Sequence, residues 1–253
     1  MSVLFPLPAR PAKPRTCGLT HVLDSGLGAL EVESLLALGA PYIDLVRLGW
    51  GSAVVTGELD RKLELYRAAG IPVMLGGTLT ELAWAHDRID ELVAWVLELG
   101  IDRIEVSSGT IAIPAEEKAR LITQLAQRIT VYAEVGEKDP EAIMAPYTWV
   151  DEIRRSFDAG AELVVCEGRA SGTAGLYRGT SELRTGLIEE IVHVVGMERL
   201  VFEAPLLRQQ AWFINRFGPE VNLGNIPSAD IVSLESLRLG LRSETVAKLH
   251  PAP

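Results

Sequence analysis

Cysteine and aromatic residues are scarce in this 253-residue chain, and long apolar runs are missing from it. Its two cysteines, Cys17 and Cys166, lie far apart and outside any Cys-x-x-Cys pattern, so we expect free thiols rather than a disulfide or a zinc site. No run of about 18 apolar residues occurs, so the sequence predicts no transmembrane helix. A formal net charge of −10 repels phosphate groups and therefore disfavours nucleic acid or a membrane surface as a partner. We expect a cytoplasmic protein.

What is abundant is aliphatic: 48% of the residues are hydrophobic although only 6% are aromatic. Leucine, valine, alanine and isoleucine suit buried parallel strands that are covered by helices. The repeated prolines of residues 1–16 predict an extended N-terminal arm, and residues 17–253 show no break in composition. We therefore expect one domain after the arm.

A pattern of short β-rich run, glycine-rich or polar turn and amphipathic stretch repeats eight times. Alternating strands and helices imply parallel pairing through right-handed crossovers, which predicts a (β/α)8 TIM barrel. A Rossmann sheet is disfavoured because Gly26-Leu27-Gly28 lacks the third glycine of the dinucleotide fingerprint. The expected strands are Gly18–Asp24, Tyr42–Gly49, Pro72–Gly77, Asp102–Ser108, Thr130–Gly136, Glu162–Gly168, Arg199–Pro205 and Glu220–Ile226. The clearest helices are Leu30–Leu38, Asp87–Leu99, Ala115–Arg128, Ser181–Val195 and Ala229–Leu239.

Four glutamates stand near the carboxyl ends of consecutive predicted strands, where the active site of such a barrel lies. They are Glu105, Glu134, Glu167 and Glu203. A buried carboxylate is costly unless it is paired or binds a cation, so a divalent ion such as Mg²⁺ would explain the cluster. Ion pairs within the barrel are the alternative. Asp24, which closes the first strand, is a further candidate ligand.

Positive side chains stand at similar heights: Arg47 ends the second predicted strand, and Lys138 and Arg169 follow the fifth and sixth. Three cations around one rim indicate an anionic ligand. The glycine-containing segments 169–175 and 223–228 could offer backbone N–H groups to a phosphate. His21 has the same parity as Leu19 and Leu23, so we expect it to point toward the helices.

Several segments, in order and at matching spacing from about Gly18 to Lys248, resemble the phosphosulfolactate synthase family. They are Gly18–Leu27, Leu48-Gly49-Trp50-Gly51, Gly76–Leu79, Glu134-Val135-Gly136, Glu167-Gly168-Arg169, Phe202–Pro205 with Gln209-Gln210, Val221-Asn222-Leu223 with Asn225-Ile226, and Leu234–Arg242. The resemblance implies an Mg²⁺-dependent barrel that adds sulfite to phosphoenolpyruvate, giving phosphosulfolactate for coenzyme M synthesis. The family also resembles a heat-stress-associated branch in plants.

The resemblance and the strand-end rule together give one set of site predictions. Lys138 would protonate the enolate carbon or hold sulfite, with Glu105 and Arg47 as further catalytic residues. The substrate would lie on Arg169, Ser171, Gly172, Gln209 and Asn225, and the cation on Asp24, Glu134, Glu167 and Glu203.

Three positions depart from the family pattern. Ser25 and Arg47 stand where the family has lysine, and Ser108 stands where it has aspartate. These changes leave open another nucleophile or another acceptor acid, and a non-catalytic stress-associated barrel is a further alternative. We also expect a homo-oligomer, for which Trp84, Trp95, Trp149 and Trp212 could supply an apolar patch.

Overall fold

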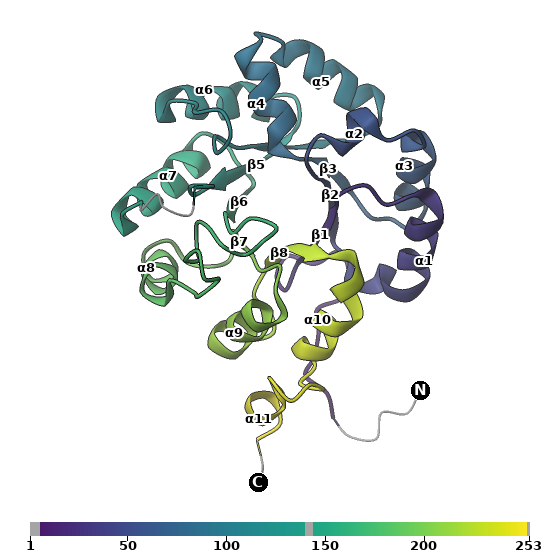
Figure 1. Cartoon of the computed structure of the whole chain (residues 1–253), viewed down its shortest axis with the longest axis vertical. Helices are drawn as coiled ribbons and strands as arrows, with labels where there is room; N and C mark the ends of the chain where they lie inside the picture. Colours follow the sequence, from purple (N-terminus) through teal and green to yellow (C-terminus); the bar gives the residue numbers. More distant parts are fainter. Residues whose placement is uncertain (1–5, 140–143, 252–253) are drawn as a thin grey trace.

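Eight parallel strands close into a barrel in sequence order, and the helices surround it (Figure 1). The computed structural model describes residues 6–139 and 144–251. Strand β1 pairs with both β2 and β8, which closes the sheet. The predicted (β/α)8 fold is therefore confirmed.

All eight predicted strands are present. They are β1 Thr20–Asp24, β2 Leu45–Leu48, β3 Val73–Leu75, β4 Arg103–Val106, β5 Thr130–Val135, β6 Leu163–Cys166, β7 Leu200–Glu203 and β8 Leu223–Pro227. The α-helices are α1 Ala29–Gly39, α2 Ser52–Val55, α3 Leu59–Ala68, α4 Gly77–Ala85, α5 Ile89–Glu98, α6 Ala115–Ala126, α7 Pro146–Asp158, α8 Thr185–Val195, α9 Leu207–Phe217, α10 Ile231–Arg238 and α11 Val246–Leu249. The 3₁₀ helices are η1 Ala40–Tyr42 and η2 Ser228–Asp230.

Some element boundaries differ from the prediction for local reasons. Tyr42 belongs to η1 rather than to a strand, because Pro41 lies in the first turn of that helix. Gly77 begins α4. Helix α8 begins at Thr185, because Ser181 has a left-handed φ of 63° in a turn that precedes the helix.

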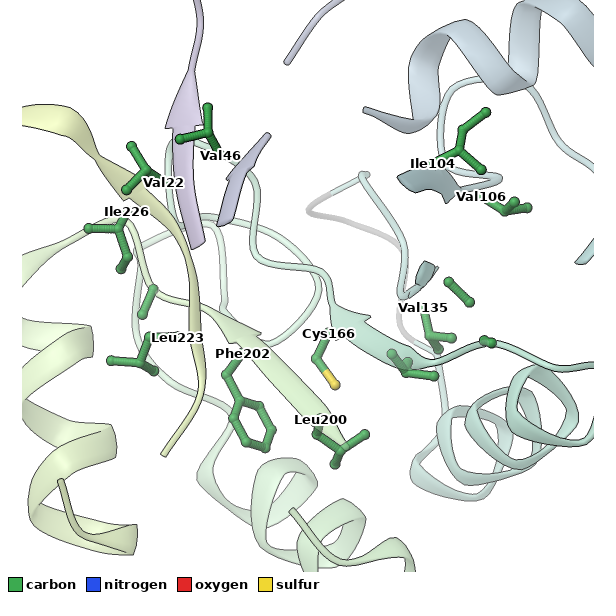
Figure 2. Packing of buried hydrophobic residues seen from close by; sticks show 14 of the residues in the cluster. Val22, Val46, Ile104, Val106, Val135, Cys166, Leu200, Phe202, Leu223 and Ile226 are labelled. Atoms are coloured by element: carbon green, nitrogen blue, oxygen red, sulfur yellow. The ribbon is translucent and has the colours of Figure 1, made fainter. Parts of the chain in front are cut away.

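Side chains alternate between the two faces of each strand and form two apolar layers. The outer layer fills the space between barrel and helices, where Figure 2 shows Val22, Val46, Ile104 and Phe202 among its members. The inner layer fills the barrel itself and consists of Leu19, Leu45, Met74, Tyr132, Leu163, Val165 and Val201. The next inward-facing residue beyond this layer, two positions further along the strand, therefore lies at the carboxyl-terminal mouth of the barrel.

His21 does not point toward the helices as predicted. Its ring stacks against Tyr132 inside the barrel, with the ring centroids 5.8 Å apart. Val22 takes the helix-facing side instead and is fully buried. Burial, with Arg47 and Arg103 nearby, lowers the pKa of His21 to about 3, so the ring is neutral.

Two arginines hold the described part of the N-terminal arm against the barrel domain. Of the predicted arm, residues 1–5 lie outside the described residues. Residues 6–16 contain no helix or strand, and Arg10 and Arg15 join them to the barrel through Glu235 and Asp44, each at 3.0 Å.

Among the described residues no helix is long and apolar enough to cross a membrane. Both cysteines are free, as expected.

The tryptophans do not form the predicted patch. Trp149 is fully buried beneath Gly136, because α7 presents it to the core. Trp84, Trp95 and Trp212 are half-buried and pack against the same core. The strongly exposed tryptophan is Trp50, at 64%.

Asp24 lies on the helix side of β1 and not at the mouth, which corrects its prediction as a metal ligand. It is fully buried and forms an ion pair with Lys62 of α3 at 2.9 Å. Tyr66 of the same helix donates a hydrogen bond to it at 2.9 Å. The carboxylate also accepts hydrogen bonds from the backbone N–H groups of Gly26 and Leu27. Asp24 therefore secures the β1–α1 turn against α3.

The Asp24–Lys62 pair generates a stability prediction. Lys62→Met leaves the Asp24 carboxylate buried without its cation, so we expect the free energy of unfolding to fall by about 3–5 kcal/mol. Arg61→Met is the matched control, since Arg61 is half-exposed on the same helix and should change stability by about 0.5 kcal/mol or less. Urea unfolding of both variants measures the difference. Equal effects of the two substitutions would contradict this account of Asp24.

Candidate active site

A cavity of about 520 Å³ opens at the carboxyl-terminal mouth of the barrel. Its walls include nine of the predicted site residues: Arg47, Glu105, Glu134, Lys138, Glu167, Arg169, Ser171, Glu203 and Asn225. Four of the charged side chains come from strand ends because each stands two residues beyond an inner apolar residue: Arg47 follows Leu45, Glu134 follows Tyr132, Glu167 follows Val165 and Glu203 follows Val201. The cavity thus rests on a filled apolar barrel.

Arg47 lies at the centre of this charged layer. Its Nη1 is 2.8 Å from Glu105 Oε2 and 3.5 Å from Glu134 Oε2, and its Nη2 is 2.9 Å from Glu203 Oε1. Nη2 also donates to the amide oxygen of Asn225. Burial alone would lower the pKa of Arg47, but the three carboxylates raise it above its ordinary value. Arg47 is therefore a fixed positive charge whose terminal N–H groups are already used by the protein.

Asn225 reaches the mouth because of an irregularity in β8. Between Thr20 and Val22 of β1, the partner strand advances from Leu223 to Ile226, so β8 contains one extra residue. Asn225 adopts a left-handed φ of 55° in this bulge. The bulge directs its amide into the barrel, toward Arg47.

Lys138 follows β5 and enters the opposite part of the layer. Its Nζ is 3.0 Å from Glu134 Oε1 and 3.9 Å from Glu167 Oε2. Burial alone would lower the pKa of Lys138, but Glu134 and Glu167 raise it above its ordinary value. The side chain is 21% exposed, so the ammonium remains open to a ligand in the cavity.

The pKa values of Glu105, Glu134 and Glu167 shift in different directions because their partners differ. Burial and the nearby Glu134 and Glu203 raise the pKa of Glu167 well above its ordinary value. Burial also raises the pKa of Glu105 despite its contact with Arg47. The pKa of Glu134 is lowered, because Lys138 and Arg47 together outweigh the effect of burial. Intramolecular ion pairs, the alternative that the sequence left open, thus account for Glu105, Glu134 and Glu203.

The donor set for the predicted Mg²⁺ is smaller than the four carboxylates proposed. No three histidine, cysteine, aspartate or glutamate side chains among the described residues are arranged to hold a metal ion. Glu167 Oε2, however, is buried and has no hydrogen-bond partner. Because Mg²⁺ often binds through one or two carboxylates and completes its shell with water and substrate oxygens, Glu134 and Glu167 fit such an ion.

The loop after β6 supplies the rim. Arg169 has a left-handed φ of 59° and lines the cavity with Ser171. Its backbone N–H donates to Glu167 Oε1 at 2.5 Å, while its side chain forms no ion pair among the described residues. Arg169 is therefore an available cation for an anionic ligand.

Gly172 and Gln209 support this rim but do not line the cavity, which corrects their prediction as binding residues. Gln209 of α9 is fully buried and donates from Nε2 to the carbonyl oxygen of Gly172 at 3.1 Å. Gly172 has a left-handed φ of 64°, and a Cβ there would lie 2.5 Å from Gln209 Nε2. The pair fixes the loop that carries Ser171.

Sequence reasoning missed several residues of the site. Trp50, Thr78 and Thr110 line the cavity, and Lys118 of α6 donates to the carbonyl oxygen of Glu134 at 2.5 Å. Trp50 and Thr78 lie inside the segments that resemble the family, which was the available signal. Of the three residues that depart from the family pattern, Ser25 and Ser108 do not line the cavity, whereas Arg47 lies at its centre.

The raised pKa of Glu167 predicts a pH-dependent cost. Between the two pKa values, the native state keeps the Glu167 proton, whereas the unfolded chain, with a pKa near 4.3, has lost it. The contribution of Glu167 to the free energy of unfolding is therefore lost as the pH rises toward the native pKa, by up to about 1.4 kcal/mol per pH unit. Glu167→Gln lacks this loss. In EDTA, its stability relative to wild type should therefore rise from about pH 5 to about pH 8. Chemical unfolding measures it, with exposed Glu182→Gln as control; a pH-independent difference would refute the shift.

Comparison with known proteins shows which family the chain resembles. The family profile of (2R)-phospho-3-sulfolactate synthase (ComA) matches residues 8–244. Phosphosulfolactate synthase of Methanothermobacter thermautotrophicus is 36% identical over 97% of this chain and 98% of its own. That of Bacillus subtilis is 36% identical over 94% and 96%. The heat-stress-associated 32 protein of Arabidopsis thaliana is 21% identical over 90% and 88%.

Solved structures share the fold at low identity. A 3-keto-L-gulonate-6-phosphate decarboxylase of Vibrio cholerae superposes with a TM-score of 0.57 at 10% identity, covering 93% of this chain and 100% of its own. A 3-hexulose-6-phosphate synthase gives 0.56 at 14% identity, over 87% and 98%. The family profile and the near-complete relatives lead to one conclusion: this chain belongs to the phosphosulfolactate synthase family.

Proposed function

We propose that the protein is a lyase-type enzyme that adds sulfite to phosphoenolpyruvate in an Mg²⁺-dependent reaction. The observation that carries this proposal is the cavity that Lys138 and Arg169 line together with a layer of carboxylates, because the two cations suit an anionic ligand. Membership of the family supports the choice of substrates. We also propose a cytoplasmic homo-oligomer.

We assign substrate binding to the rim of the cavity. Arg169 has no competing ion pair among the described residues, and the hydroxyl of Ser171 lies 2.7 Å from that of Thr173 on the same loop. A guanidinium and a hydroxyl on a loop suit a phosphate or a carboxylate. Arg47 contributes through its fixed charge, because its terminal N–H groups are occupied.

The chemistry falls to Lys138. The sulfur lone pair of sulfite attacks C3 of phosphoenolpyruvate, and the C2–C3 π electrons move toward C2 and the carboxylate. Lys138 gives a proton from Nζ to C2, and the amine then regains the proton that bisulfite or water releases. One C–S bond and one C–H bond form, and no oxidant or reductant is required. The ammonium and Arg47 stabilise the negative charge that develops on the carboxylate side.

A divalent cation on Glu134 and Glu167 would neutralise substrate oxygens and favour that same charge. Glu134 holds the Lys138 ammonium at 3.0 Å. The pairing keeps the lysine protonated and directed, which is the state that a proton donor needs.

Lys138→Arg tests the assignment. It preserves the charge opposite Glu134 but removes a transferable proton, so turnover of phosphoenolpyruvate with sulfite should fall by about 10²–10⁴-fold while the Tm is kept. Lys248→Arg, on the exposed surface, is the control. Mass spectrometry of the phosphorylated sulfonate product follows the reaction. Wild-type activity retained by Lys138→Arg would show that the proton comes from elsewhere.

Metal dependence is tested separately. Exhaustive EDTA treatment should abolish turnover, and Mg²⁺ should restore it, because the proposed reaction needs the ion to offset the negative charge of the substrate oxygens, with Glu134 and Glu167 as its protein ligands. The rate at controlled free Mg²⁺ concentrations is the measurement. Full turnover in EDTA would assign Glu134 and Glu167 to ion pairing alone.

A further inference from the structure

Glu81 lies behind the cavity rather than in its wall. It belongs to α4 and its side chain is fully buried. One oxygen accepts hydrogen bonds from the Ser107 hydroxyl and from the backbone N–H of Gly109 at 3.0 Å. The other accepts from the backbone N–H groups of Thr110 at 2.9 Å and Ile111 at 2.6 Å. Four donors use the full acceptor capacity of one carboxylate.

This carboxylate therefore holds the turn after β4 in one conformation. Residues 107–111 contain no helix or strand, and hydrogen bonds from the turn to Glu81 take the place of a backbone ladder. Helix α4 itself is fixed to β4, because Thr80 donates to the carbonyl oxygen of Glu105 at 2.7 Å and Gly77 N–H donates to its carboxylate at 2.9 Å. The turn is thus tied to the barrel through α4.

The turn is the surface against which Lys138 lies. A Cβ on Gly109 would stand 2.5 Å from Lys138 Cδ and 2.7 Å from Cγ, so the lysine stem rests directly on the glycine backbone. At the end of that stem, Nζ is 3.8 Å from Glu81 Oε1, in addition to its contacts with Glu134 and Glu167. Thr110 of the same turn lines the cavity.

We propose that Glu81 is a positioning residue for Lys138: it fixes the 107–111 turn, and the bare backbone of Gly109 confines the lysine stem so that the ammonium points into the cavity. The proposal deepens the proposed sulfite addition and rests on it for the role of the lysine. A lysine stem is flexible, and a displacement of about 1 Å at a reacting group can cost 10²-fold in rate. Confinement by a rigid turn removes that freedom before the substrate binds.

Two substitutions separate the parts of this device. In Glu81→Gln the amide nitrogen cannot accept, so two of the four donors lose their partner and the turn loosens. Gly109→Ala leaves the carboxylate in place but pushes the lysine stem aside. We expect either change to lower kcat by roughly 10- to 100-fold with KM for phosphoenolpyruvate within about threefold, since Arg169 is untouched. Exposed Glu91→Gln should leave both constants unchanged.

Hydrogen exchange distinguishes positioning from general damage. The amides of Gly109, Thr110 and Ile111 should exchange faster in Glu81→Gln but not in Gly109→Ala, although both variants lose activity. If Gly109→Ala keeps wild-type kcat, or if Glu81→Gln loosens the turn without a loss of kcat, the proposal is overturned. Gly109→Ala also answers the question if Glu81→Gln does not fold.

A readout without substrate separates this proposal from the proposed function. Acylation of Lys138 by an amine-reactive ester, measured by mass spectrometry at one pH against exposed Lys248, should be faster in both variants than in wild type. An inactive wild type with this acceleration would reject the sulfite reaction and keep the positioning role. Unchanged acylation in both variants would overturn the positioning role whatever the activity.

Discussion

The burial of four carboxylates at the mouth of one barrel is the constraint on which the site depends. Such a cluster is unstable unless cations or protons offset its charge. Arg47 offsets Glu105 and Glu203 and also contacts Glu134, which Lys138 neutralises from the other side. The Lys138 ammonium is 3.9 Å from Glu167, and burial together with the nearby Glu134 and Glu203 outweighs it and raises the pKa of Glu167. The pKa values of Arg47, Glu134, Lys138 and Glu167 are thus shifted by one another.

The barrel delivers this layer through simple geometry. Residues two apart on a strand share a face, so an apolar plug of side chains such as Tyr132 and Val165 forces the next inward residues to the mouth. The irregularity in β8 turns the Asn225 side chain toward Arg47, with which it forms a hydrogen bond that regular strand pairing would not allow. On β2, β5, β6 and β7, the apolar layer that fills the barrel and the charged layer of the site are therefore two residues apart.

Sequence reasoning predicted the eight strands and the convergence of Glu105, Glu134, Glu167 and Glu203, because period and strand-end position are local properties. The period alone did not place Asp24, because the sequence does not show which face of β1 meets the helices: we expected the face of His21, whereas the structure puts Val22 and Asp24 on that side. Contacts between residues far apart in the sequence could not be predicted. Nothing in a helix sequence shows that Glu81 caps a turn far along the chain, or that Gln209 supports Gly172 instead of binding a ligand.

The account makes Lys138 a proton donor fixed on one side of the bound enol phosphate, and isotope incorporation tests that claim most directly. Phosphoenolpyruvate and sulfite are to be incubated with the wild-type protein and Mg²⁺ in D₂O, and the sulfonate product analysed by NMR. The account predicts one deuterium at C2 and a single configuration at that carbon, because one donor reaches one face. A mixture of configurations at C2, or no sulfonate product at all, would contradict it.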